Sequence, residues 1–171
     1  MRKVLFIFGQ LRDTDVEWLA KHGRRKRLPS GSVLIHEGVS VDTLYIVLEG
    51  QLTVVQERTK REIARLGVGE LVGEMSFIEA RPPNATVRAA TDVVVYAIDK
   101  QQLQQHLSRD EGFAARFYRA VALFLSDRVR KMTGDEGEAG SADELDDSVL
   151  DTVDRAGARF DSFGRQLLDG T

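Results

Sequence analysis

Short apolar runs separated by single glycines dominate the chain between Arg24 and Ile98. The run from Leu44 to Leu48 ends at a Glu49-Gly50 turn, and a second run follows from Leu52. Short runs with turn residues between them are typical of antiparallel strands. The pattern predicts a mainly β fold with flanking helices, whose centre is an antiparallel, jelly-roll-like β-roll.

Helical spacing appears on both sides of this region. Residues 14–17 (Thr-Asp-Val-Glu) form a capping box and predict a helix that runs to about His22. A short helix is expected over about 99–107. Residues 108–111 (Ser-Arg-Asp-Glu) form a second capping box, which predicts a long helix over about 111–133 that ends at Gly134.

The long helix carries two apolar lines at helical spacing. The first line is Phe113, Phe117, Val121 and Phe124, and the second is Tyr118, Leu125, Val129 and Met132. Two lines predict two contacts, one of them with the β-roll. The other line would cover a ligand pocket or pair with the same helix of a second subunit. An arrangement in which both lines pack into one core, without a dimer, stays open.

The composition changes after Gly134, because Asp135 to Asp154 contain no lysine or arginine. Residues 1–133 therefore form the predicted domain, 134–144 an acidic linker, and 145–171 an amphipathic helical tail. The tail carries an apolar seam of Leu145, Val149, Val153, Ala156, Phe160, Phe163 and Leu167. Such a seam either folds back on its own domain or docks on a second copy or another protein.

Composition excludes several classes of function. A net charge of -3 argues against a general affinity for nucleic acid or anionic membranes. The absence of cysteine excludes disulfides and thiol nucleophiles, and it fits a cytoplasmic protein. No stretch approaches the roughly 20 apolar residues that span a bilayer, so no membrane insertion is expected.

No catalytic pattern is present either. His22, His36 and His106 fall on separate elements without ligand spacing, so no metal site is predicted. The sequence has no nucleophile elbow, P-loop or dinucleotide fingerprint. We therefore expect no enzyme activity and no cofactor.

Residues 69–88 are the most informative segment. They read as the end of a strand, a Gly73-Glu74 turn, a short helix, a proline-containing loop, and a new strand that starts at Ala85. Free backbone N–H groups at such a turn can bind phosphate or another anion. The segment therefore predicts a pocket.

This segment resembles the phosphate-binding cassette of the cyclic-nucleotide-binding domain family. The matching residues are Gly73-Glu74, Pro82 and Ala85-Thr86-Val87, together with 28–35, Gly38 and 42–50 upstream. The resemblance covers about residues 5–133. It implies a ligand site made of Gly73, Glu74, Met75, Ser76, Pro83, Asn84, Ala85 and Thr86.

In the family, the glutamate at Glu74 accepts hydrogen bonds from the ribose 2′-hydroxyl. An alternative is that Glu74 only satisfies free N–H groups at the start of its helix. The chain departs from the family at Pro83, where the arginine that clamps the cyclic phosphate is expected. Losing that charge-assisted bond costs roughly 1.5–3 kcal/mol, about ten- to a hundredfold in affinity.

Two other arginines are candidates to replace the clamp. Arg81 precedes Pro82-Pro83, which favour an extended chain that points away from the phosphate seat. Arg88 shares a strand face with Thr86 and would line the pocket if Thr86 faces the ligand. For both, the alternative is a solvated surface arginine.

The sequence thus favours a non-enzymatic regulatory or sensor module that binds a small anionic ligand, with a cyclic nucleotide such as cyclic AMP as a candidate. It would signal through its C-terminal helices to a second copy in a homodimer or to a protein partner. The predicted interaction residues are Phe117, Val121, Phe124, Leu125, Val149, Val153, Phe160, Phe163 and Leu167. The alternative is a degenerate domain that binds no nucleotide and serves as an interaction or oligomerisation scaffold.

Direct DNA binding is not expected. Transcription factors of the family carry a basic winged helix-turn-helix after the long helix. In this chain that place holds the acidic stretch, which repels the phosphate backbone.

Overall fold

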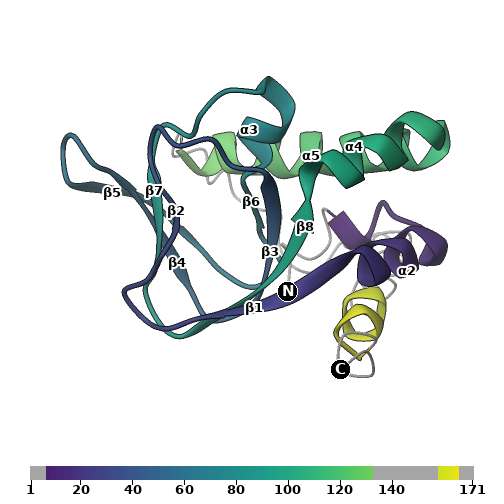
Figure 1. Cartoon of the computed structure of the whole chain (residues 1–171), viewed down its shortest axis with the longest axis horizontal. Helices are drawn as coiled ribbons and strands as arrows, with labels where there is room; N and C mark the ends of the chain where they lie inside the picture. The colour runs from purple at the N-terminus through teal and green to yellow at the C-terminus, as the bar shows by residue number, and fades with distance from the viewer. Residues whose placement is uncertain (1–6, 133–157, 166–171) are drawn as a thin grey trace, which may run out of the picture.

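The computed structural model describes residues 7–132 and 158–165 (Figure 1). The predicted linker 134–144 and the seam residues Leu145, Val149, Val153 and Leu167 lie outside these residues.

In the described part of the chain, eight antiparallel strands form two four-stranded sheets. One sheet has the order β1 (Gly23–Leu28), β8 (Val93–Asp99), β3 (Thr43–Glu49) and β6 (Leu71–Val72). The other has the order β2 (Val33–Ile35), β7 (Thr86–Ala89), β4 (Leu52–Gln56) and β5 (Arg61–Leu66). This arrangement confirms the predicted β-roll.

Alternation along β3 and β8 divides the core into two parts. Leu44, Ile46, Tyr96 and Ile98 belong to a cluster that the helices cover. Their neighbours Tyr45, Val47, Val93, Val95 and Ala97 point into the roll and pack with the second sheet. Because both faces of β8 are buried, its sequence is an almost continuous apolar run instead of an alternating one.

The helices are α2 (Asp13–His22), α3 (Glu74–Glu79), α4 (Lys100–Arg109) and α5 (Glu111–Met132). The bounds predicted for α4 and α5 are close to those observed. The N-terminal capping residues of α2 and α5, however, differ from those predicted. The N-cap of α2 is Arg12, whose N–H is accepted by Asp15 at 2.7 Å. At α5 the carboxylate of Asp110 accepts the N–H of Phe113 at 2.8 Å. Asp110 thus caps this helix in place of the predicted Ser108.

An aromatic stack joins α2 to α4. The Trp18 ring lies between His22, at 4.2 Å, and His106, at 4.0 Å, with both imidazoles nearly parallel to the indole. His106 also contacts Phe113 of α5 at 5.0 Å between ring centroids. These contacts fix the outer end of α4 against two other helices.

The side chains of α5 do not follow the predicted division in full. Phe117, Val121 and Phe124 are buried in the protein's own core, and Leu125 packs partly against it. This corrects the prediction that the first three face a partner, because α5 needs that line to cover the sheet of β3 and β8. Tyr118 and Val129 of the second line are exposed.

Residues 158–165 form a helical segment that lies beside α2 (Figure 1). Phe163 is fully buried and contacts Phe8 and Tyr96, with ring centroids 5.3 Å and 4.6 Å away. Phe160 contacts Phe8 at 5.3 Å. This part of the tail therefore folds back on its own domain. Phe163 was predicted to contact a partner, but it is buried in the protein's own core and cannot do so.

Candidate functional site

The candidate site begins at the turn between β6 and α3. Gly73 precedes α3 with φ of 89°, a left-handed conformation that glycine adopts at little cost. A Cβ at this position would lie 3.1 Å from the Thr43 carbonyl oxygen. Glycine therefore allows the chain to turn sharply here, which directs α3 and its first residue, Glu74, inward.

A cavity of about 80 Å³ lies behind this turn. Its walls are mostly apolar side chains of both sheets, and Glu74, Ser76, Asn84 and Arg128 add polar groups. The lining residues are Ile35, Val54, Leu66, Val72, Gly73, Glu74, Met75, Ser76, Pro83, Asn84, Ala85, Val87 and Arg128. The structure thus brings seven of the eight predicted ligand residues to one hollow.

Thr86 is the exception. Ala85 and Val87 line the cavity, so alternation turns Thr86 to the other side of β7. Its hydroxyl oxygen instead accepts the N–H of Glu37 at 3.2 Å. The expectation that Thr86 faces the ligand seat is therefore wrong for this structure.

The two predicted substitutes for the missing clamp also lie away from the cavity lining. Arg88 shares the outward direction of Thr86 on β7 and is exposed. The side chain of Arg81 is 81% exposed and approaches Glu79 at 4.0 Å. The half-buried Pro83 accepts the N–H of Gly38 through its carbonyl at 2.8 Å.

Glu74 is buried, and its carboxylate forms an ion pair with Arg128 of α5. Burial raises the pKa of Glu74 above its usual value, while the charges of Arg128 and Lys100 and local hydrogen bonds partly oppose that change. The net direction is upward. One guanidinium therefore does not fully offset the cost of removing this carboxylate from water.

Arg128 was not predicted as a site residue. Among the described residues that line the cavity, Arg128 is the one with a positively charged side chain. Its guanidinium carbon lies 5.3 Å from the ring centroid of Phe124, within cation–π range. A signal was present in the sequence, because Arg128 continues the apolar line of Phe117, Val121 and Phe124 at the same helical spacing.

Lys100 is a second residue that the sequence reasoning missed. This buried side chain, at the first position of α4, donates to the Val41 carbonyl and the Ser76 hydroxyl, each at 2.7 Å. Burial lowers the pKa of Lys100, while the charges of Asp42 and Glu74 oppose the shift. Lys100 thereby ties α3 to the start of α4.

The described residues, 7–132 and 158–165, contain no group of three or more His, Cys, Asp or Glu side chains placed to hold a metal ion. They also contain no helix with the length and apolar character needed to cross a bilayer.

Two of the curated relatives that match this chain differ in how much of it they share. A protein of Mycobacterium tuberculosis, described as an uncharacterized NTE family protein, is 27% identical over 163 residues, which are 95% of this chain and 28% of the relative. The cAMP-activated global transcriptional regulator CRP of Salmonella typhimurium is 32% identical over 97 residues, which are 54% of this chain and 46% of the relative. The chain thus spans less than half the length of either relative.

Among solved structures, the N-terminal domain of a transcriptional regulator from Streptomyces coelicolor matches with a TM-score of 0.60 and 32% identity. The match covers 82% of this chain and 99% of that domain. The family model for the cyclic nucleotide-binding domain matches residues 25–110. With its two antiparallel sheets, its α3 turn and its long helix α5, the chain belongs to the cyclic nucleotide-binding domain family.

Proposed function

We propose that this chain is a regulatory module that binds a small anionic ligand in the cavity behind α3 and signals through α5. The family is one of regulatory, generally non-enzymatic domains. A cyclic nucleotide is the first candidate ligand, and the name of the Salmonella relative, a cAMP-activated regulator, supports that choice.

One observation carries the proposal. The cavity that holds seven predicted ligand residues is also lined by Arg128, which belongs to α5. A change in the cavity can therefore reach α5 through a single contact. If the protein has two conformations that differ in the position of α5, a ligand that binds one of them more tightly increases the population of that conformation.

Calorimetric titration with cyclic AMP, cyclic GMP and cyclic dinucleotides tests ligand binding. Heat at micromolar concentrations of one of them would support the proposal. Pro83→Arg restores the family clamp and should raise cyclic AMP affinity at least tenfold, since one charge-assisted bond contributes roughly 1.5–3 kcal/mol. Pro83→Ala is the matched control, because it removes the ring and restores the backbone N–H, as Pro83→Arg does, without adding a side-chain donor.

A second candidate is a domain that binds no nucleotide and serves as a scaffold. The cavity favours it, because 80 Å³ is small beside the roughly 300–1,000 Å³ typical of ligand pockets. Pro83 favours it as well. Absence of heat with every nucleotide, for both the wild type and Pro83→Arg, would support the scaffold and contradict the sensor.

The partner in either case is proposed to bind the exposed side of α5. Tyr118, Leu123 and Val129 are 45%, 37% and 59% exposed on this helix. A second copy that uses the same side would give a homodimer, and Tyr118→Glu should then reduce the mass measured by light scattering. In the Mycobacterium relative the matched region is 28% of the protein, so a neighbouring domain is the other candidate recipient of the signal.

A further inference from the structure

We propose that Arg128 and Glu74 form a latch, in which α5 closes the cavity with its own cation and opens when this ion pair breaks. The identity of the ligand that enters the cavity rests on the proposed function, but the ion pair and its opening do not. Its physical basis is the burial of Glu74, the position of Arg128 and the size of the cavity.

Glu74 needs a donor in every state in which it stays buried and charged. Its side chain is 4% exposed, and Arg128 is its ion-pair partner from α5. A buried carboxylate without a partner is strongly unfavourable, so loss of Arg128 must be followed by protonation, by water entry, or by a ligand that supplies donors. The contact therefore links the contents of the cavity to the position of α5.

Arg128 can leave more easily than Glu74. Its side chain is 24% exposed, and it lies on the last two turns of α5, after the buried Phe124. The Phe124 ring supports the guanidinium from one side. The expected motion is thus a release of the end of α5 beyond Phe124, while Phe113 and Phe117 keep the first half of the helix on the sheet.

The latch defines the ligand that can open it. A ribose 2′-hydroxyl offers a hydrogen-bond donor to Glu74 and would take the place of the guanidinium there. Arg128 and the ligand then compete for one carboxylate, so that ligand binding and docking of the helix end oppose each other. A ligand that engages Arg128 through its own anion would show the reverse coupling.

A single cysteine can measure opening without any ligand, because the natural chain has none. Ala85 is buried and lines the cavity, so the thiol in Ala85→Cys reacts with iodoacetamide only when the cavity opens. Arg128→Met keeps an apolar side chain near Phe124 but removes the charge. We expect alkylation to become at least tenfold faster in Arg128→Met than in the parent Ala85→Cys protein.

Two controls separate the latch from general loss of structure. Arg119→Met removes one exposed charge from the same helix and should leave the alkylation rate unchanged. A separate protein with Ala120→Cys, at a fully buried position earlier in α5, should react slowly with or without Arg128→Met. Equal acceleration at both cysteines would indicate global unfolding and overturn the latch.

Glu74→Gln removes the other charge of the same ion pair. It should also accelerate alkylation at position 85, but by less than Arg128→Met, because the neutral amide leaves no buried unpaired charge, and it serves if the arginine variant does not fold. Combining the two changes should add little, because they break one interaction. Wild-type rates in both single variants, or fully additive effects, would refute the proposal.

Titration with cyclic AMP separates the latch from the ligand hypothesis. Competition predicts at least tenfold tighter binding by Arg128→Met than by the wild type, with Arg119→Met unchanged. Weaker binding by Arg128→Met would show that Arg128 assists the ligand and would overturn the competition. Faster alkylation with no cyclic AMP binding to any variant would support the latch and count against the nucleotide as ligand.

Discussion

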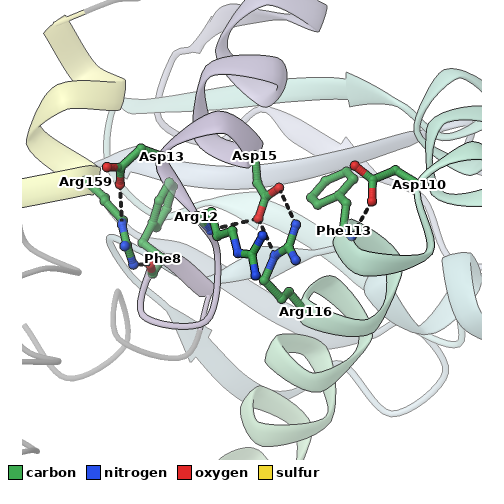
Figure 2. Close-up of polar contacts among 8 residues, drawn as sticks. All are labelled: Phe8, Arg12, Asp13, Asp15, Asp110, Phe113, Arg116 and Arg159. Carbon is green, nitrogen blue, oxygen red and sulfur yellow. Dashed lines mark hydrogen bonds and ion pairs between the residues drawn. The ribbon is translucent and has the colours of Figure 1, made fainter.

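Asp15 and Glu74 are buried carboxylates that each pair with an arginine of α5, and their surroundings differ. Asp15 accepts from Nε and Nη2 of Arg116 at 2.7 and 2.8 Å, and from the N–H of Arg12 at 2.7 Å (Figure 2). Glu74 pairs with one guanidinium nitrogen of Arg128. Each side chain is 4% exposed, but more protein surrounds Glu74 than Asp15, so burial disfavours the charged form more strongly at Glu74.

The pKa values of the two groups move in opposite directions. Burial tends to raise the pKa of Asp15, but the hydrogen bonds and charges of Arg116 and Arg12 outweigh it, and the net pKa is lowered. At Glu74 burial prevails and the pKa is raised. Deeper burial and fewer donors together make the ion pair of Glu74 easier to open, whereas several donors at Asp15 brace the fold.

The largest expected effect follows loss of charge at Asp15. Asp15→Asn should lower the free energy of unfolding at neutral pH by about 2–4 kcal/mol, because Arg116 loses a two-point partner and the cap of α2 weakens. Urea denaturation followed by circular dichroism measures the change. A loss below about 1 kcal/mol would contradict the view of this pair as a brace.

Glu74→Gln should change the free energy of unfolding by less than about 1 kcal/mol at neutral pH. The amide avoids the burial cost of a charge, which offsets the lost attraction to Arg128. The same denaturation experiment applies. A loss as large as that of Asp15→Asn would show that both pairs brace the fold and would remove the contrast.

The pH dependence should sharpen the comparison further. Asp15, with a lowered pKa, contributes stability above its unfolded pKa near 3.8 that is lost as the pH falls through its folded pKa. Glu74, with a raised pKa, behaves in the opposite way: the wild type gains stability relative to Glu74→Gln as the pH falls from neutral toward 4.5. Denaturation of the wild type and both variants between pH 3 and pH 7 measures both trends.

The smallest effect on the free energy of unfolding is expected at Asp13, the exposed ion-pair partner of Arg159 in the segment 158–165. Arg159 donates to Asp13 at 2.7 Å, but the Asp13 side chain is 81% exposed (Figure 2). Asp13→Asn should therefore cost about 0–1 kcal/mol. It also serves as the control for Asp15→Asn, since both changes neutralise an aspartate in the first turn of α2. A larger loss would mean that the docking of Phe163 depends on this contact.

Much of the fold was predictable because its signals are local. Alternation and glycine turns mark the strands, and two apolar lines mark α5. The caps at Thr14 and Ser108 were wrong because the same short pattern also arises inside a helix or beside a better cap. Asp15 and Asp110 supplied the caps, and their roles depend on where the chain enters each helix.

The site was less predictable because its chemistry is long-range. A resemblance in the segment 73–87 placed seven residues at one cavity, but it did not tell which face of β7 Thr86 occupies. Glu74 and Arg128 are 54 positions apart, and a contact of that separation exists only once the β-roll has formed. The interruption of an apolar helical line by Arg128 was the available sign.

The stack around Trp18 has a practical consequence. The chain contains one tryptophan, and its indole lies between two imidazoles on α2 and α4. Helix α4 starts at Lys100, which holds Ser76 of α3. A ligand that displaces α3 would also move α4, and with it the imidazole that stacks on the indole. The intrinsic tryptophan fluorescence of the unlabelled protein should therefore change when a ligand binds in the cavity.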